Sequence, residues 1–173
     1  PLETFDVNLN GTINLLEQIR KNNNETSLIL ASTDKVYGEP KYLPIDEEHP
    51  LLGKSPYDAR KIAADRAAYV YFSTYSLPVS IIRCSNIYGG RDSNGLRAIP
   101  DFITSIINNQ PPVIRGNGEH KRDYLFIADA VEAYLKIAEN IEKTKGETFN
   151  FGTSRPTTVK EVAQKILELA GLE

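Results

Sequence analysis

The sequence predicts an α/β fold in which helices flank a parallel sheet and a small additional lobe is attached. Helical and strand patterns alternate along most of the 173 residues. The strand patterns at 27–32 and 78–90 are continuous apolar runs, as expected for strands that are buried on both faces of a parallel sheet. Polar residues occur where both runs end, and ligands of such sheets bind beyond the carboxyl ends of the strands.

The first half of the chain predicts a helix, a strand, a second helix and a second strand. Residues 2–21 place apolar side chains at spacings of three and four, the pattern of an amphipathic helix, which Gly11 interrupts. The strand at 27–32 leads into a proline-rich loop at 39–56. A long helix is expected over 56–75, with a proline in its first turn.

The second half continues the alternation less regularly. A third helix is expected to begin near Pro100, and PPVIRG at 111–116 predicts a short strand. Residues 123–141 begin as a strand pattern and continue as a helix, and 147–153 predict another strand. Thr157–Thr158 are expected to cap a final helix.

Composition excludes several classes of function. The net charge is −3, and no cluster of basic residues forms a stripe for nucleic acid. No apolar run reaches the roughly 18 residues of a membrane span. The single cysteine, Cys84, fits a reducing compartment, so we expect a cytoplasmic protein. His49 and His120 have no cysteine or carboxylate at ligand spacing, so no metal site is predicted.

Two features predict that the chain is a piece of a longer protein. The sequence contains no methionine, and it opens inside a predicted helix. A small processed protein without methionine is the alternative.

Tyr57 and Lys61 are candidates for acid–base chemistry. They are four residues apart on the predicted helix 56–75 and therefore share one face. A tyrosine ordinarily titrates near pH ~10, and a neighbouring ammonium favours the phenolate form. A phenolate can accept the proton of a hydroxyl group at neutral pH. Taken alone, the pair is equally compatible with a surface contact.

Six segments of the chain together match the motifs of one known family. In chain order they are VNLNGT (7–12), STDKVYG (32–38), SPYDARK (55–61), RCSNIYGG (83–90), VIRGNGEHKRDYLFIADAVEA (113–133) and FNFGT (149–153). With them the chain resembles the extended short-chain dehydrogenase/reductase family, particularly its nucleotide-sugar dehydratases and epimerases. The resemblance implies a Rossmann-type NAD-binding domain, here its second half at 1–90, with the 148–153 strand returning to it. It also implies a lobe for a nucleotide-diphosphate sugar at 91–173.

The glycine-rich phosphate loop of that family, GxxGxxG, has no counterpart in this sequence. The resemblance therefore implies that the first four strands and most of the adenosine site are absent. The implied cofactor is NAD, with NADP as the alternative, and this chain alone is not expected to bind it tightly.

The resemblance also assigns roles to individual residues. Tyr57 corresponds to the base that takes the proton from the sugar O4, and Thr33 to a hydrogen-bond partner of the same oxygen. Lys61 corresponds to the lysine that favours the phenolate and binds the nicotinamide ribose. Cys84 and Ser85 lie where the backbone of the family passes the nicotinamide.

Asp34 and Lys35 favour one branch of the family. A 4-epimerase needs only the tyrosine, the lysine and the Ser/Thr, whereas a 4,6-dehydratase must also remove the C5 proton and protonate the departing C6 hydroxyl. The Asp-Lys pair is similar to that of CDP-glucose 4,6-dehydratases. We therefore predict a nucleotide-sugar 4,6-dehydratase. A 4-epimerase and an inactive nucleotide-sugar-binding fragment are the alternatives.

Four further residues match positions that contact the nucleotide sugar in the family: Asn86, Arg97, Arg115 and Arg122. Guanidinium groups bind the oxygens of a diphosphate, often through two parallel hydrogen bonds. The resemblance also implies a homodimer that forms through helix 2–21 and the helix that carries Tyr57.

Overall fold

The computed structural model describes residues 2–22 and 26–172, and the contacts within it divide the chain into two compact units. Unit 1 comprises Pro1–Ser85 and Asp129–Phe151, and unit 2 comprises Asn86–Ala128 and Gly152–Glu173. The assignment of an NAD-binding and a nucleotide-sugar-binding domain to this chain stays a prediction. Within the described ranges, none of the helices is both long enough and apolar enough to cross a membrane.

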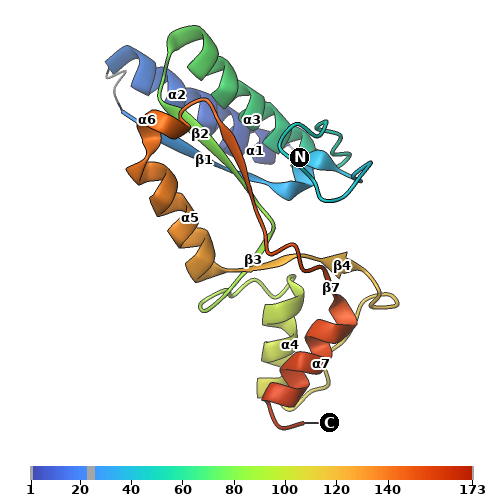
Figure 1. Ribbon diagram of the computed structural model, residues 1–173. Coiled ribbons are helices and arrows are strands. Elements are labelled where there is room, and N and C mark those ends of the chain that lie inside the picture. Colours follow the sequence, from blue (N-terminus) through green and yellow to red (C-terminus); the bar gives the residue numbers. More distant parts are fainter. Residues whose placement is uncertain (1, 23–25, 173) are drawn as a thin grey trace. The chain divides into compact units, whose positions relative to one another are not determined.

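A three-stranded parallel sheet forms the centre of unit 1, with the strand order β1–β2–β6 (Figure 1). The strands are β1 (Leu28–Thr33), β2 (Val79–Cys84) and β6 (Thr148–Phe151). The register pairs Thr33 with Cys84 and Cys84 with Phe151, so the carboxyl ends of all three strands are level. The predicted parallel α/β architecture is thus confirmed.

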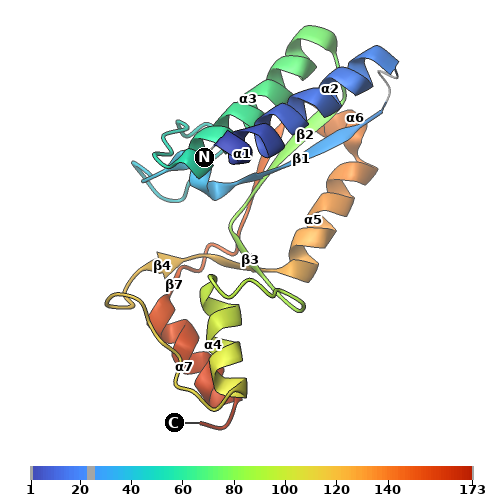
Figure 2. The ribbon, with the colours of Figure 1, turned by 180° about the vertical axis from the view of Figure 1, so that it is seen from behind.

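Helices lie on both sides of this sheet, as both views show (Figures 1 and 2). On one side, α2 (Gly11–Asn22) and α3 (Pro56–Tyr75) lie next to each other. On the other side lie α5 (Ile127–Glu139), which belongs to unit 1 from Asp129 onward, and α6 (Ile141–Thr144).

The first predicted helix is continuous through Gly11. It consists of α1 (Leu2–Phe5), a π-helical turn η1 (Asp6–Asn10) and α2. Gly11 has helical backbone angles, φ −59° and ψ −43°, and its N–H donates to the carbonyl oxygen of Asp6. The helix therefore continues through Gly11, with one wider turn before it.

Local signals determine where α3 begins. The Ser55 hydroxyl accepts a hydrogen bond from the Asp58 N–H at 3.1 Å, and the Asp58 carboxylate accepts one from the Ser55 N–H at 2.9 Å. Pro56 follows in the first turn. This reciprocal cap satisfies N–H groups that a helix start leaves without partners. It confirms the predicted helix 56–75 and fixes the turn that carries Tyr57.

The core of unit 1 lies between the α2–α3 layer and the sheet. Six buried residues form it: Leu16, Ile19, Ala68, Leu77, Val79 and Ile81. Leu16 and Leu77 are completely inaccessible to solvent. Burial of such aliphatic side chains contributes about 1.5–3 kcal/mol each and holds α2 and α3 on the sheet.

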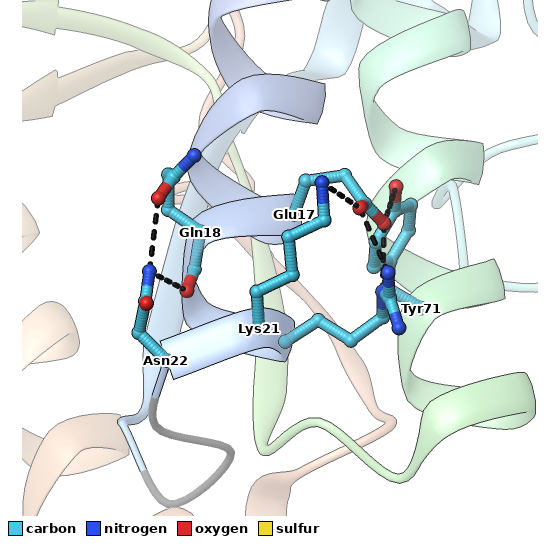
Figure 3. Close-up of polar contacts among 6 residues, drawn as sticks. Glu17, Gln18, Lys21, Asn22 and Tyr71 are labelled. Atoms are coloured by element: carbon cyan, nitrogen blue, oxygen red, sulfur yellow. Dashed lines mark hydrogen bonds and ion pairs between the residues drawn. The ribbon is translucent and has the colours of Figure 1, made fainter.

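A polar contact also joins α2 to α3 (Figure 3). The Glu17 carboxylate accepts hydrogen bonds from Arg20 Nε at 2.8 Å and from the Tyr71 hydroxyl of α3 at 2.8 Å. Lys21 Nζ lies 3.3 Å from its second oxygen. Glu17 therefore links the two helices at a point where both are partly exposed.

Unit 2 contains two small sheets and two helices. Its elements are β3 (Asn86–Tyr88), parallel to β5 (Tyr124–Phe126); β4 (Lys121–Arg122), antiparallel to β7 (Thr157–Thr158); and the packed helices α4 (Ala98–Ile107) and α7 (Val159–Leu169). Thr158 caps α7, because its hydroxyl accepts from the Glu161 N–H and its own N–H donates to the Glu161 carboxylate. The predicted cap is confirmed.

Two sequence-based strand predictions are wrong. The run 78–90 is not one strand, because it separates at Ser85. The Ser85 N–H donates to the Phe151 carbonyl in unit 1, whereas the Asn86 N–H donates to the Asp123 carbonyl in unit 2. The segment 111–116 forms no strand. Its two prolines provide no N–H groups, and the chain turns at Gly116, where φ is +79°.

Candidate active site at the carboxyl end of the sheet

Thr33 is the last residue of β1 and the N-cap of the short 3₁₀ helix η2 (Asp34–Tyr37). Its side chain is buried, with 8% exposure. Thr33 Oγ1 donates to Asp34 Oδ1 at 3.1 Å and accepts from the Lys35 N–H at 3.4 Å. The hydroxyl is thus held at the end of the strand by the two polar residues that follow it.

Asp34 and Lys35 form an ion pair although they are neighbours in sequence. Lys35 Nζ lies 3.4 Å from Asp34 Oδ1. The Lys35 side chain is 44% exposed and the Asp34 side chain is 33% exposed. Consecutive side chains of a strand point to opposite faces, so this contact requires the strand to end at Thr33. The structure therefore places a carboxylate and an ammonium together at the carboxyl end of β1.

Tyr57 and Lys61 occupy the first two turns of α3, which packs against β1 and η2. The Tyr57 ring is 38% exposed, and the Arg60 guanidinium lies 4.5 Å from its centroid. Lys61 Nζ donates to the Ala31 carbonyl at 2.8 Å. Burial lowers the pKa of Lys61, and the positive charge of Arg60 adds to this effect. The lysine is therefore anchored two residues before Thr33.

Cys84 and Ser85 follow at the end of β2. Cys84 is 4% exposed, and burial raises the pKa of its thiol to about 11, with a smaller contribution from the Asp34 charge. Ser85 Oγ is buried and has no hydrogen-bond partner within the described residues. Buried hydroxyls nearly always have partners, so this one fits a position where a bound ligand completes the hydrogen bond.

The four predicted nucleotide-sugar contacts, Asn86, Arg97, Arg115 and Arg122, all lie in unit 2. Arg97 is the N-cap residue of α4 and pairs with Asp92 at 3.0 Å. Arg122, on β4, donates to the Lys121 carbonyl at 2.9 Å, and Arg115 is exposed. The arginines thus come from three separate segments.

Asp123 is a residue of unit 2 that sequence analysis missed. Its carboxylate accepts from the Thr153 N–H, the Thr153 hydroxyl and the Ser154 N–H, at 3.0, 2.5 and 2.9 Å. Its carbonyl accepts from the Asn86 side chain at 3.2 Å. Thr153 is 30 positions away, so no short spacing in the sequence indicates these contacts.

A second missed group lies beneath the site in unit 1. Asp65 and Arg83 form a buried ion pair, with 1% and 5% side-chain exposure. Nothing in their local sequence distinguishes them from surface charges, and only the packing of α3 on β2 brings them together.

The side chains of the candidate site in unit 1 are of types that can donate or accept protons. A hydroxyl, a carboxylate, a phenol and two ammonium groups come from the end of β1, the start of η2 and the first turns of α3. Within residues 2–22 and 26–172, no three His, Cys, Asp or Glu residues are grouped to hold a metal ion.

A parallel sheet that presents these groups at its carboxyl edge is the arrangement of an extended short-chain dehydrogenase/reductase, as the resemblance implies. Comparison with known proteins identifies the family within this class. The chain belongs to the GDP-mannose 4,6-dehydratase family, whose family model matches residues 1–173.

Relatives of the chain include both dehydratases and epimerases. It is 38% identical, over 164 residues and 94% of its length, to a protein of Methanocaldococcus jannaschii named as a UDP-glucose 4-epimerase. A Bacillus anthracis dTDP-glucose 4,6-dehydratase solved with NAD matches 98% of the chain, with 36% identity and a TM-score of 0.89. A UDP-N-acetylglucosamine 4-epimerase of Methanobrevibacter ruminantium, solved with UDP-N-acetylmuramic acid, matches all of it with 27% identity and a TM-score of 0.91.

The chain spans about half the length of these relatives. It covers 52% of the Methanocaldococcus protein, 53% of the Bacillus enzyme and 56% of the Methanobrevibacter enzyme.

Proposed function

We propose that the protein to which this chain belongs is an NAD-dependent nucleotide-sugar 4,6-dehydratase. The observation that carries the proposal is the Asp34–Lys35 ion pair next to Thr33. Oxidation at C4, which 4-epimerases also perform, needs only Tyr57, Lys61 and Thr33. An additional acid and base beside the sugar have a purpose only if water is lost across C5 and C6.

NAD is the proposed cofactor, and the residues of unit 1 fit it. Ser85 Oγ, at the end of β2, is a buried hydroxyl without a hydrogen-bond partner among the described residues. Lys61 Nζ donates to the Ala31 carbonyl, two residues before the end of β1. The Bacillus relative was solved with NAD. When bound, NAD supplies the group that accepts hydride from the sugar C4 and later returns it to C6.

The protein residues would manage the protons of this reaction. The Lys61 ammonium stabilises the Tyr57 phenolate, and Tyr57 Oη takes the proton of the sugar O4 hydroxyl and becomes a neutral phenol. Thr33 Oγ1 hydrogen-bonds to O4 and orients it. These three groups together produce the 4-keto sugar.

Elimination then requires two more transfers. The 4-keto group makes the C5 proton acidic, and the Asp34–Lys35 pair supplies a base to remove it and an acid to protonate the departing C6 hydroxyl. As hydride returns to C6, the Asp34 carboxyl gives the proton back to C5, and solvent restores the proton that Lys35 gave to the leaving water and takes up the proton that Tyr57 removed from O4. The product is a 4-keto-6-deoxy sugar.

We further propose that Arg97, Arg115 and Arg122 bind the diphosphate of the substrate, assisted by Asn86. Guanidinium groups suit two adjacent phosphates because each offers parallel donors. All four residues lie in unit 2, consistent with a lobe for the nucleotide sugar.

Product analysis on the full-length protein tests the proposal. The protein is incubated with NAD and, separately, with CDP-glucose, dTDP-glucose, UDP-glucose and GDP-mannose, and products are identified by mass spectrometry and NMR. A product lighter by one water, with a keto carbon at C4 and a methyl group at C6, is the expected result. A C4 epimer of unchanged mass from any of these substrates contradicts it.

A 4-epimerase is the second candidate, and the names of the Methanocaldococcus and Methanobrevibacter relatives favour it. It would use Tyr57, Lys61 and Thr33 in the same way. A third candidate, a binding module without turnover, predicts saturable binding of the nucleotide sugar and no product.

We also propose a homodimer that forms through α2 and α3. Large apolar side chains on these helices are exposed, including Leu15 at 49% and Val70 at 45%. Sedimentation of the protein and of the Val70→Asp variant tests this, and a wild type that remains monomeric at high concentration contradicts it. The expected cytoplasmic location stays a prediction.

A further inference from the structure

Asp65 shares one face of α3 with the two candidate catalytic residues of that helix. Tyr57, Lys61 and Asp65 follow one another at intervals of four residues. Unlike the exposed Tyr57, Asp65 is only 1% exposed. A carboxylate that is removed from water to this degree needs charged and hydrogen-bonding partners.

These partners come from both neighbouring strands. Arg83 of β2 donates from Nη2 to Asp65 Oδ1 at 2.8 Å and from Nε to Oδ2 at 2.9 Å. Ser32 of β1 donates from Oγ to Asp65 Oδ2 at 2.8 Å. Ser32 and Arg83 are register partners in the sheet. Asp65 therefore links α3 to β1 and β2 through one pair of register partners in the sheet.

This pair of register partners is immediately next to the candidate site. The next register pair along the sheet is Thr33 with Cys84. One turn earlier on α3, Lys61 donates to the Ala31 carbonyl, so two turns of the helix are bonded to neighbouring residues of β1.

The same group of contacts continues to the helix that carries Asp34. Arg83 Nη1 donates to the Tyr37 hydroxyl at 2.7 Å, and that hydroxyl donates to Asn150 Oδ1 of β6 at 2.6 Å. Tyr37 is the last residue of η2, which begins at Asp34. Every segment that holds a candidate acid or base is therefore attached to Arg83 and Asp65.

We propose that Asp65 and Arg83 are positioning residues, which set the rotation and the height of α3 relative to the ends of β1 and η2. The proposal rests on the proposed function. A bidentate pair fixes an angle as well as a distance, unlike a single hydrogen bond or a hydrophobic contact. Through it, α3, which carries Tyr57 and Lys61, is held against β1 and η2, which carry Thr33, Asp34 and Lys35. Displacement of reacting groups by ~1 Å lowers rates by about 100-fold.

The experiment compares variants of the full-length protein. Ser32→Ala removes one hydrogen bond to Asp65, Arg83→Lys keeps the charge but removes the fork, and Asp65→Asn removes the carboxylate charge. Ser80→Ala is the matched control, because Ser80 is fully buried in β2 and its hydroxyl donates to the Thr144 carbonyl outside this group. All rates are measured well below the unfolding temperature of each variant.

The expected result distinguishes a positioning role of Asp65 and Arg83 from a role in stability alone. Arg83→Lys and Asp65→Asn should lower kcat by about 100-fold and Ser32→Ala by about tenfold, while KM for the nucleotide sugar stays within about twofold. Ser80→Ala should lower the unfolding temperature without changing kcat. If Asp65→Asn does not fold, the kcat values of Arg83→Lys and Ser32→Ala test the proposal. Variants that lose stability but keep wild-type kcat overturn the proposal.

A readout that is independent of turnover separates this proposal from the proposed function. If the wild type converts none of the four nucleotide sugars, the proposed function fails. The NMR signal of ¹³C-methylated Lys61 then decides the positioning role. A shift of this signal in Ser32→Ala and Arg83→Lys, with no shift in Ser80→Ala, supports positioning. An unchanged signal in the first two variants overturns it.

Discussion

The Lys61 ammonium donates a 2.8 Å hydrogen bond to the carbonyl oxygen of Ala31, which ties the second turn of α3 to β1. The side chain is thereby held beside the strand end instead of extending into solvent. Burial lowers the pKa of Lys61, so the folded protein holds this proton less tightly than the unfolded chain does.

Replacing Lys61 with methionine should separate activity from stability. Loss of the ammonium that we propose stabilises the Tyr57 phenolate is expected to lower kcat by about 100- to 10,000-fold. The unfolding temperature at neutral pH should stay within a few degrees or rise, because the folded state no longer holds a partly buried charge. Steady-state kinetics and thermal unfolding measure both effects.

Lys165→Met is the matched control, since Lys165 is exposed on α7 and, among the described residues, pairs only with Glu168 in the next turn. It should change neither quantity. Full activity in Lys61→Met would show that this lysine has no part in the mechanism.

The direction in which pH changes the stability contribution of Lys61 follows from its lowered pKa. Between the folded pKa and the ordinary value of 10.5 the unfolded state binds more protons, so the Lys61 contribution to stability rises with pH in that window.

Asp34→Asn should stop dehydration without stopping oxidation. The amide keeps the size of the side chain and still accepts a hydrogen bond from Thr33, but it cannot take up a proton. We expect release of the 4-keto-6-deoxy product to fall by about 100- to 10,000-fold. Absorbance at 340 nm should still rise in a single turnover, because C4 is still oxidised. Product formation at the wild-type rate would exclude Asp34 from the elimination step.

Local signals in the sequence were sufficient to predict where α3 and α7 begin and where the strand that carries the site ends. Ser55 and Pro56 define the start of α3, and Thr158 defines that of α7, because caps depend on residues a few positions apart. The three polar residues after the β1 run also predicted the end of the strand, and β1 does end at Thr33.

The parts that sequence analysis missed depend on distant partners. Arg83 lies in an apolar strand, and Asp65, 18 positions earlier, appears as an ordinary helix charge until β1, β2 and α3 are packed together. The break in the strand at Ser85 also depends on distant residues. The Ser85 N–H donates to the Phe151 carbonyl and the Asn86 N–H donates to the Asp123 carbonyl, and neither partner is close in sequence.

Cys84 should be unreactive in the folded protein. Burial raises the pKa of its thiol to about 11, so very little thiolate is present at pH 8. A thiol reagent such as 5,5′-dithiobis(2-nitrobenzoate) should label the native protein slowly at this pH and label the denatured protein fully. Native Cys84→Ser serves as the blank. Rapid labelling of the native wild type would contradict the buried position.

Adjacent leucines on α2 provide a test of the core. Leu16 has no exposed surface, whereas Leu15 is 49% exposed. Leu16→Ala should lower the free energy of unfolding by about 2–5 kcal/mol, because it leaves a cavity beneath the helix. At a protein concentration low enough for the protein to be monomeric, Leu15→Ala should change it by no more than about 0.5 kcal/mol. Urea unfolding of both variants measures the difference, and equal effects would show that α2 packs differently.

Glu17 should stabilise the α2–α3 contact in a pH-dependent way. Hydrogen bonds from Arg20 and then from the Tyr71 hydroxyl lower the pKa of Glu17 from 4.5 to about 2. A carboxyl with a lowered pKa in the folded state stabilises the protein fully above its unfolded pKa. This stabilisation is lost as the pH falls through the folded value. Glu17→Gln should therefore be less stable than the wild type at pH 7, and the difference should shrink between pH 4.5 and about 2.

Carboxyl NMR titration locates the midpoint directly, and urea unfolding at several pH values measures the difference in stability. Glu168→Gln is the control, because within the part of the chain that the structure describes Glu168 pairs only with Lys165 of the same helix and contacts no second element through its carboxylate. Its stability should follow that of the wild type across the whole range. A Glu17 midpoint near 4.5, or a stability difference that is constant with pH, would mean that the Tyr71 and Arg20 contacts do not hold α2 against α3 in solution.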